Sequence, residues 1–115
     1  MGMIDKFSFG TITVDDQVYN NDIKIIDGTV VPDWWRKSGH TVDVDDVDDI
    51  LQAKPDIVVI GKGEPGYMRV TDSLKEIAAS RGIKLVVENT SAAGKTFNRL
   101  CKEGRNVAGG FHVSC

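Results

Sequence analysis

The sequence predicts a single α/β domain in which helices alternate with the strands of a central sheet. Three observations support this. Apolar residues in the first 40 positions are spaced as in strands, whereas after residue 41 they recur at helical spacing in three stretches, each followed by a short apolar run. The chain has 115 residues, of which 41% are hydrophobic and 27% charged, which is the balance of one soluble domain rather than two.

The first 40 residues predict a small antiparallel meander that packs outside the rest of the domain. Apolar residues between 7 and 14 are spaced as in strands, and Asp15–Asp16 suits a turn. A second apolar segment covers residues 23–26. A third, at residues 30–31, ends at Pro32, which cannot continue a strand ladder.

A helix is predicted from about Thr41 to Lys54–Pro55. Its apolar positions recur at intervals of three and four residues, at Val44, Val47, Ile50 and Leu51. The other face and the first turns carry five acids that oppose the positive end of the helix dipole, namely Asp43, Asp45, Asp46, Asp48 and Asp49. The β-branched run that follows, residues 56–60, predicts a buried strand.

A loop over residues 61–66 leads to a second predicted helix. Thr71 or Asp72 is expected as its N-cap, and Gly82 as its C-terminal cap. Residues 83–87 then predict the next strand. Because the two strands flank a helix, we expect them to be parallel and joined by a right-handed crossover.

Thr90 is expected to cap a third helix that runs to about Glu103. The last predicted strand covers residues 107–113. Within it Gly109–Gly110 makes the strand thin enough for a neighbouring group to approach closely.

Composition and charge argue against several classes of partner. Fourteen Lys and Arg against seventeen Asp and Glu give a net charge of −3, without a basic cluster that would neutralise nucleic-acid phosphates. The longest apolar run, Ile57–Ile60, is far shorter than the roughly 20 residues that cross a bilayer. Two cysteines are too few for a disulfide framework, so we expect a cytoplasmic protein. We expect no nucleic acid, no membrane and no cofactor.

Two glycine motifs resemble nucleotide-binding loops. Gly61–Gly66 matches G-x-G-x-x-G and is followed by Glu88 at the end of the next strand, as in a dinucleotide fold. However, Pro65 removes one amide donor and the helix begins only near Thr71. We therefore interpret this motif as a tight glycine turn.

The second motif, Asn89–Thr96, approaches the phosphate loop and ends in Gly94–Lys95–Thr96. A phosphate loop stays non-helical, whereas this segment begins a helix, so we interpret it as an ordinary amphipathic helix.

The loops after the two predicted parallel strands lie side by side at the edge where open α/β sheets bind ligands. A small anion or acidic metabolite is our hypothesis for this edge. The candidate ligand-binding residues are Gly61, Lys62, Gly63, Gly66, Arg69, Thr90, Ser91 and Lys95.

His40 and His112 are the two histidines, and with Cys101 and Cys115 they do not make convincing ligands for a closed zinc site. We predict no metal and no catalytic triad. Cys115 is a candidate reactive thiol, whereas Cys101 on an apolar helix face is expected to be inert.

Trp34–Trp35–Arg36 is the candidate partner surface, because Trp and Arg dominate interface hot spots. The competing interpretation is that at least one Trp covers the sheet.

Several short segments together resemble a known family. They are Phe9–Gly10 with Val14, Trp35–Arg36 before Gly39–His40, Pro55–Gly63, Asn98 before Glu103–Val107, and Phe111–Cys115. In order and spacing they are similar to the methanogen-type small α/β domain of unknown function, a family that includes the adipogenesis-associated domain-containing protein and a mitochondrial complex I assembly factor. The resemblance implies a three-layer domain with a mixed central sheet, an antiparallel last strand and an added β-meander. It implies no established enzyme activity.

The sequence therefore predicts a non-enzymatic binding or assembly domain with an unknown protein partner. The alternative is a binder or enzyme for a small anionic ligand at the strand-end loops. The two differ in whether small molecules or only protein raise the melting temperature.

Overall fold

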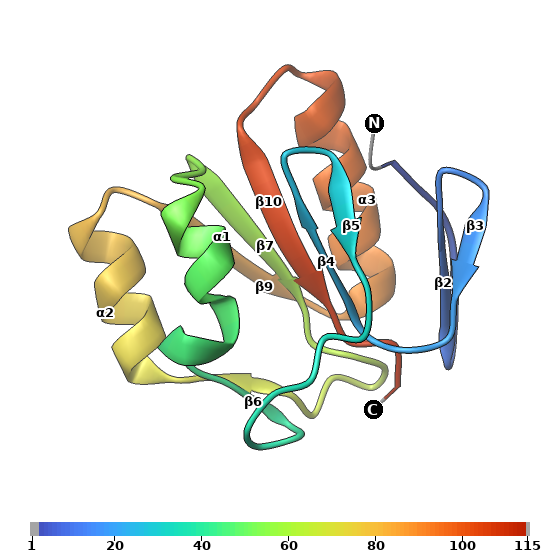
Figure 1. Cartoon of the computed structure of the whole chain (residues 1–115), viewed down its shortest axis with the longest axis horizontal. Coiled ribbons are helices and arrows are strands. Elements are labelled where there is room, and N and C mark those ends of the chain that lie inside the picture. The colour runs from blue at the N-terminus through green and yellow to red at the C-terminus, as the bar shows by residue number, and fades with distance from the viewer. Residues whose placement is uncertain (1–2, 115) are drawn as a thin grey trace.

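Three adjacent parallel strands form one side of a five-stranded sheet. They are β7 (Ile57–Gly61), β9 (Lys84–Glu88) and β10 (Val107–Phe111), and β7 lies between the other two. The computed structural model describes residues 3–114 (Figure 1). The predicted parallel pairing of the strands after residues 56 and 83 is confirmed, since Ile57 to Gly61 pair in register with Lys84 to Glu88. The α/β fold class is likewise confirmed.

Two antiparallel strands complete this sheet on the other side of β10. They are β4 (Ile23–Ile26) and β5 (Thr29–Val31), and the strand order is β5-β4-β10-β7-β9. We expected these segments in the outer meander, which is wrong because Ile23, Lys24 and Ile25 are all buried, as an interior strand requires. The sheet is mixed as expected, but its last strand in sequence, β10, is antiparallel to β4 alone and parallel to β7.

The outer meander is a separate three-stranded sheet of β1 (Ile4–Ser8), β2 (Thr11–Val14) and β3 (Gln17–Tyr19). The expected turn at Asp15 and Asp16 is confirmed, and both residues have positive φ angles, 49° and 67°, which suits a tight hairpin. The Asn98 side chain fixes β1 to the last helix, because it accepts from Ile4 N–H at 2.9 Å and donates to Ile4 O at 2.6 Å.

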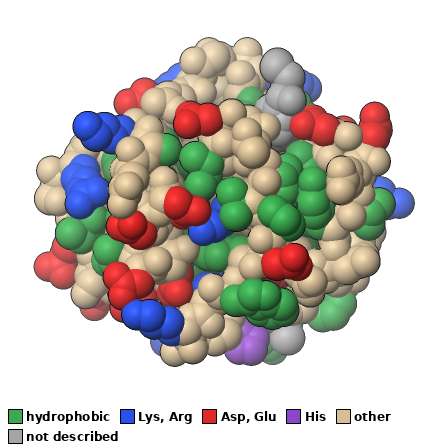
Figure 2. Space-filling view, viewed as in Figure 1, with side chains coloured by type: hydrophobic (Ala, Val, Ile, Leu, Met, Phe, Trp, Pro, Cys, Tyr) green, Lys and Arg blue, Asp and Glu red, His purple; other side chains and the backbone are tan. Residues whose placement is uncertain are grey.

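The acid-rich segment is not one helix from Thr41. It forms a short strand β6 (Thr41–Val42), a 3₁₀ turn η1 (Val44–Val47) and a short helix α1 (Asp48–Gln52), and β6 pairs with β8 (Arg69–Val70). Asp43 and Asp46 form a reciprocal capping box, which starts the 3₁₀ turn. Other acids pair with Lys24 and Lys37 on neighbouring segments, so charges of both signs are interspersed on the molecular surface (Figure 2).

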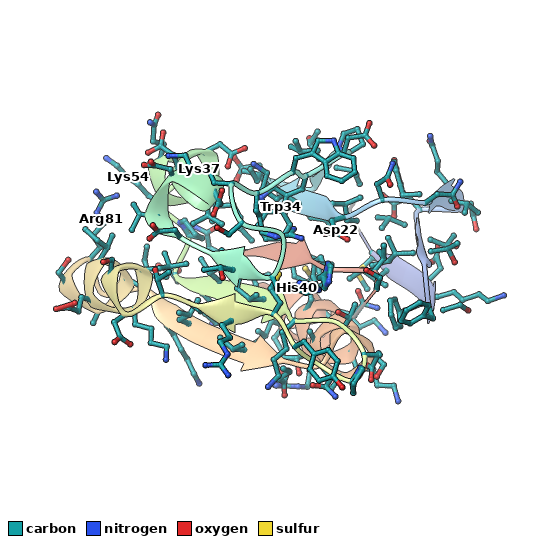
Figure 3. All side chains as sticks on the ribbon, turned by 90° about the horizontal axis from the view of Figure 1, so that it is seen from below. Asp22, Trp34, Lys37, His40, Lys54 and Arg81 are labelled. Carbon is teal, nitrogen blue, oxygen red and sulfur yellow. The ribbon has the colours of Figure 1, made fainter. Side chains whose placement is uncertain are left out.

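Helices cover both faces of the sheet. Helix α3 (Thr90–Lys102) packs on β7, β10 and β1, whereas α1 and α2 (Asp72–Ser80) pack on the opposite face (Figure 3). The predicted Thr71 cap of α2 is confirmed, since its hydroxyl accepts from Leu74 N–H. None of the helices within residues 3–114 has the length and apolarity needed to span a bilayer.

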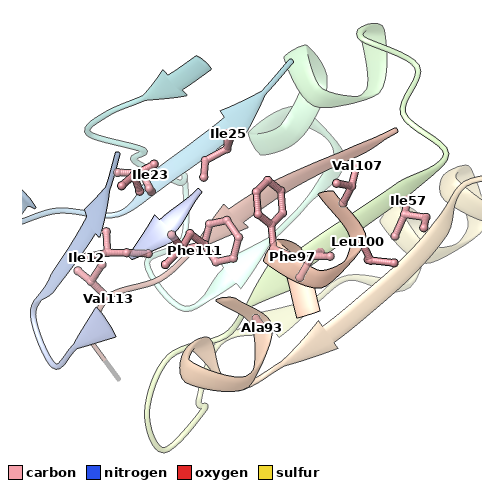
Figure 4. Close-up of a cluster of buried hydrophobic side chains, with 13 residues drawn as sticks. Ile12, Ile23, Ile25, Ile57, Ala93, Phe97, Leu100, Val107, Phe111 and Val113 are labelled. Carbon is pink, nitrogen blue, oxygen red and sulfur yellow. The ribbon is translucent and has the colours of Figure 1, made fainter. Parts of the chain in front are cut away.

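Strand alternation divides the apolar interior into two clusters. Ile57 and Val59 belong to the cluster that contains Phe97 of α3. Figure 4 shows Ile57, Phe97 and Phe111 in this cluster. Val58 and Ile60 belong to the other cluster. The predicted close approach at the paired glycines is confirmed. A Cβ at Gly109 would lie 2.7 Å from the Phe111 ring, and one at Gly110 would lie 2.8 Å from the Trp34 ring. The glycines therefore make room for one aromatic ring on each face.

Candidate functional site

The loop after β7 is fixed to the start of α3 by a buried threonine. The Thr90 hydroxyl accepts from Gly63 N–H at 2.9 Å and donates to His112 O at 2.6 Å. We expected Thr90 as the N-cap of α3, but Asn89 takes that position because the Thr90 hydroxyl is committed to these two backbone groups. A Cβ at Gly61 would lie 2.9 Å from the same hydroxyl, so glycine is required there for close packing.

The N-terminus of α3 already has a carboxylate beside it. Glu64 accepts from Ser91 N–H at 3.0 Å and from the Ser91 hydroxyl at 2.7 Å. The Ser91 side chain, followed by its backbone N–H, lowers the pKa of Glu64. We call the segments Gly61–Gly66 and Glu88–Ser91 the strand-end corner. In this corner the Glu64 carboxylate occupies the position beside the N-terminus of α3 that an external anion would take.

The eight candidate ligand-binding residues do not all meet in the strand-end corner. Gly61, Gly63, Gly66, Thr90 and Ser91 do, and the Lys62 side chain packs beside Gly66. Arg69 lies in β8, and Lys95 lies in the second turn of α3.

The second glycine motif is part of a helix and not of a loop. Gly94–Lys95–Thr96 lies inside α3, as the helical interpretation requires. The Thr96 hydroxyl donates to Glu88 Oε1 at 2.7 Å, so the carboxylate at the end of β9 is held by α3, the helix that follows it in the chain.

A buried cluster of Asp22, Arg36 and His112 lies where β4 and β10 meet. Asp22 Oδ2 is 2.7 Å from both Arg36 Nη2 and His112 Nδ1, and Asp22 Oδ1 accepts from Val113 N–H at 2.8 Å. The strand register forces this meeting, because Phe111 pairs with Ile23 and therefore places the residue after β10 beside the residue before β4. All three side chains are at most 10% exposed.

The hydrogen bonds within this cluster fix its protonation. Burial by itself would raise the pKa of Asp22, but hydrogen bonds from His112, the Val113 N–H and Arg36, together with the Arg36 charge, outweigh it and lower that pKa. Asp22 is therefore a carboxylate near neutral pH, and His112 Nδ1 carries the proton that it donates to Asp22. The second nitrogen of His112, Nε2, is buried and has no hydrogen-bond partner among residues 3–114.

His40 brings a second imidazole to this cluster. Its ring lies perpendicular to the His112 ring, with centroids 5.6 Å apart. Both histidines line a pocket of about 310 Å³ together with Asp22, Trp35 and Arg36. We call this pocket the histidine pocket, and Figure 3 labels Asp22 and His40 within it.

The loop that carries Arg36 and His40 is anchored by Trp34. Trp34 is 3% exposed, donates from Nε1 to Asp46 O at 2.9 Å and packs its ring against Gly110. Arg36 stacks over the Trp34 ring at 4.7 Å and donates to Gly39 O at 2.8 Å. Of the candidate partner surface, Trp34 and the Arg36 side chain are therefore buried, and Trp35 at 74% exposure is the one residue that faces outward.

Sequence reasoning missed Asp22 altogether, and it considered the histidines for a metal site and a catalytic triad but not for an ion-pair cluster. A lone Asp before a strand carries no local signal, because its partner His112 is 90 positions away. Within residues 3–114 no group of three or more His, Cys, Asp and Glu side chains is arranged to hold a metal ion. Burial raises the pKa of the Cys101 thiol, in line with the expected low reactivity. Cys115 lies outside the described residues.

Comparison with known proteins then identifies the family. The family model "Protein of unknown function (DUF498/DUF598)" matches residues 4–112. The chain belongs to this family. Among solved structures, the protein named MT938 is similar over 98% of both chains, with a TM-score of 0.82 and 26% identity.

Two further structures share the fold. The conserved hypothetical protein PH1505 from Pyrococcus horikoshii OT3 has a TM-score of 0.85 at 20% identity, over 97% of this chain and 98% of its own. A Bordetella pertussis protein described as a Mth938-like domain has a TM-score of 0.65 at 18% identity, over 97% of this chain and 85% of its own. The resemblance to the methanogen-type domain of unknown function is thereby confirmed.

Proposed function

We propose that this chain is a non-enzymatic binding domain that docks a partner protein through Trp35. The observation that carries the proposal is the contrast within three consecutive residues. Trp35 is 74% exposed, whereas Trp34 is buried and the Arg36 side chain is 4% exposed. Exposed Trp side chains that a partner can cover are among the commonest interface hot spots.

The anchoring of its neighbours prepares Trp35 for binding. Trp34 is held by Gly110 and Asp46, and Arg36 is held by Asp22 and Gly39. The backbone at Trp35 is therefore fixed at both sides before a partner arrives. Since ordering a loop is one of the main costs of association, a fixed Trp gives more affinity than a mobile one.

Two further exposed aromatic residues lie on neighbouring loops. Phe9 and Tyr67 are each 64% exposed. Phe9 precedes Gly10, which lines the histidine pocket together with Trp35 and Ser114. The carbonyl oxygen of Ser114 accepts from Glu64 N–H, which lies in the same loop as Tyr67. We infer that the partner presents apolar side chains to this aromatic rim of Phe9, Trp35 and Tyr67. A cytoplasmic location is part of the same proposal, and cell fractionation tests it.

The test compares the wild type with Trp35→Ala. Proteins captured from an extract of the source organism are identified with both baits, and the one lost with Trp35→Ala is purified and titrated by calorimetry. We expect its affinity to fall about 30-fold, which corresponds to ~2 kcal/mol.

The matched control is Val18→Ala, which truncates an apolar residue of 58% exposure in β3. It is expected to bind as the wild type does. A purified partner that binds Trp35→Ala as tightly as the wild type would contradict the proposal. Equal melting temperatures of the three proteins would show that the fold is intact.

A small anionic ligand at the strand-end loops is the second candidate function. Lys62 and Arg69 form no ion pair within the described part of the chain, which favours it, while Glu64 at the start of α3 competes with any added anion. Titration with inorganic phosphate followed by NMR tests this candidate. Saturable shifts of the Gly63 and Ser91 amides that disappear in Lys62→Ala would support it, and unchanged amides would reject it.

A further inference from the structure

We propose that two copies of this chain associate through β9, which pairs with β9 of the second copy as antiparallel strands around a two-fold axis at Val86. This inference does not depend on the partner surface at Trp35. It rests on the free edge of β9, on the direction of its backbone groups and on the way its side chains match those of a reversed copy.

Strand β9 is the outermost strand of the five-stranded sheet (Figure 1). It pairs with β7 on one side, and no strand within residues 3–114 pairs with its other side. The opposite edge strand of the sheet, β5, has three residues and is followed at once by Pro32, which cannot continue a ladder. Strand β9 has five residues and no proline. It is therefore the edge of this sheet that can take up a further strand.

The backbone groups of β9 that face outward belong to Leu85 and Val87. Lys84 N–H donates to the carbonyl of the residue before β7, and Glu88 O accepts from the N–H of the residue after β7, both at 2.9 Å. Both ends of β9 are thus directed at β7. Because successive residues of a strand direct their backbone groups to opposite sides, the N–H and C=O of Leu85 and Val87 point to the free edge.

A second copy supplies matching backbone groups when the strands run antiparallel with Val86 opposite Val86. Leu85 then lies opposite Val87 of the second copy, and their N–H and C=O groups face each other, as a hydrogen-bonded antiparallel pair requires. The two-fold axis repeats this pair on the other side of Val86. All five residues of β9 are then paired, and each partner uses the same surface, as in an isologous dimer.

The charged ends of β9 match in the same register. Lys84 lies opposite Glu88 of the second copy in a non-hydrogen-bonded pair, where side chains are closest, and the symmetry repeats this contact at the other end. Lys84 is exposed and forms no ion pair within the described part of the chain. Glu88 uses Oε1 to accept from the Thr96 hydroxyl, which leaves Oε2 for a cation.

The apolar centre of β9 also gains a cover. Val87 is 36% exposed, and in the dimer it lies opposite Leu85 of the second copy. Apolar and β-branched pairs of this kind are the ordinary stabilising contacts between neighbouring strands.

The charges select this dimer over other ways of pairing the edge. Parallel pairing of two β9 strands in register would place Lys84 beside Lys84 and Glu88 beside Glu88, and like charges at such positions are destabilising. The antiparallel dimer occupies the free edge of both copies, so association through β9 ends at two copies.

The experiment measures self-association of the full chain by sedimentation velocity, from about 10 μM to 1 mM protein. Because one strand pair is a small interface, we expect a reversible dimer at the upper end of this range. Lys84→Glu and Glu88→Lys each place like charges opposite one another at both ends of the interface. Each is expected to weaken the dimer about tenfold or more. Lys6→Glu makes the same change of charge at an exposed position of β1 in the separate sheet, and this matched control should dimerise as the wild type does.

A mixture of the two charge variants gives the decisive result. Lys84→Glu has an acid at both ends of β9 and Glu88→Lys has a base at both ends, so every charge faces its opposite in a mixed dimer. The equimolar mixture should therefore dimerise about tenfold more tightly than either variant alone. Damage to the fold of either variant would not produce this rescue, and circular dichroism checks that both are folded.

Amide hydrogen exchange measured by NMR locates the interface. The Leu85 and Val87 amides face the free edge, so their exchange should slow at concentrations at which the dimer forms. The Val86 amide points to β7 and should be protected at every concentration.

Three results would overturn the proposal. They are a monomer at every concentration, a wild-type dimer that neither charge variant weakens, and a mixture of the variants that dimerises no more tightly than either alone. In the second case, loss of the dimer in Trp35→Ala would assign self-association to the aromatic rim and not to β9.

Discussion

The strand-end corner and the histidine pocket meet at one residue but differ in how their polar groups are satisfied. The backbone N–H of His112 donates to Gly61 O at 2.9 Å, and the backbone carbonyl of His112 accepts from the Thr90 hydroxyl. The backbone of His112 therefore belongs to the strand-end corner, whereas its side chain belongs to the histidine pocket. In the corner, Thr90 and Glu64 pair with backbone groups of the facing segment. In the pocket, Nε2 of His112 has no partner within residues 3–114.

The difference separates a structural loop from a candidate binding site. The glycine-rich loop has the sequence pattern of a nucleotide site, yet its geometry is explained by Thr90 and Glu64. The pocket has no recognisable local motif, yet it holds a buried carboxylate, a guanidinium and a histidine in fixed geometry. Unsatisfied chemistry is therefore a better guide to function here than the glycine spacing.

The largest effect is expected from breaking the ion pair in the histidine pocket. Arg36→Met leaves the buried Asp22 carboxylate without its cation, which should lower the free energy of unfolding by about 3 kcal/mol or more. Urea unfolding followed by circular dichroism measures this loss.

Its neighbour provides a matched control. Lys37→Met removes a cation whose partner Asp45 is exposed, at 75% and 72% side-chain exposure for the pair, and should leave the unfolding midpoint unchanged. If the two variants unfolded at the same urea concentration, Arg36 would not stabilise the buried Asp22 carboxylate, and His112 and Val113 alone would do so. The polar contacts of the histidine pocket would then contribute less to stability than those of the strand-end corner.

A smaller loss is expected from opening the strand-end corner. Thr90→Val keeps the side-chain shape but leaves Gly63 N–H and His112 O unpaired in a buried place, at a cost of about 2 kcal/mol. Thr96→Val removes a partly exposed hydroxyl from the same helix and should cost less. If both variants unfold at the same urea concentration, the corner is held by Glu64 and not by Thr90.

Much of the fold was predictable from periodicity, whereas the membership of strands in sheets was not. Apolar runs predicted β7, β9 and β10, and Gly109–Gly110 predicted the close approach of a neighbouring group, which the structure shows to be an aromatic ring on each face. The assignment of β4 to the central sheet depends on its pairing with β10, which lies near the other end of the chain, as in the pair Gly109 and Ile25. Spacing within a segment carries no information about such long-range pairing.

The candidate site was harder to predict for the same reason. The segment Trp34–Trp35–Arg36 was identified by residue type, but which of its side chains turn inward depends on Gly110 and Asp22, which are remote in sequence. Asp22 and His112 come together because β4 and β10 are adjacent and antiparallel. A single sequence shows neither adjacency nor direction.

The smallest expected effect concerns the exposed carboxylate of the strand-end corner. The pKa of Glu64 is lowered from its ordinary 4.5 by Ser91, so the folded state favours the ionised form. Its contribution to stability is present above pH 4.5 and is lost as the pH falls through the lower folded-state value. Glu64→Gln should therefore cost under about 1 kcal/mol at pH 7, because water screens a group at the surface, and the cost should shrink as the pH falls.

Asp22 gives the acid dependence of the other region the same sign, since its pKa is also lowered. Asp22 is buried, however, so it should account for more of the acid-induced loss of stability than Glu64 does. We therefore expect Glu64→Gln to keep most of the decrease in unfolding free energy that the wild type shows as the pH falls. Urea unfolding between pH 3 and pH 7 checks this. If Glu64→Gln removed most of the pH dependence, the main acid-sensitive contact would be in the corner and not in the histidine pocket.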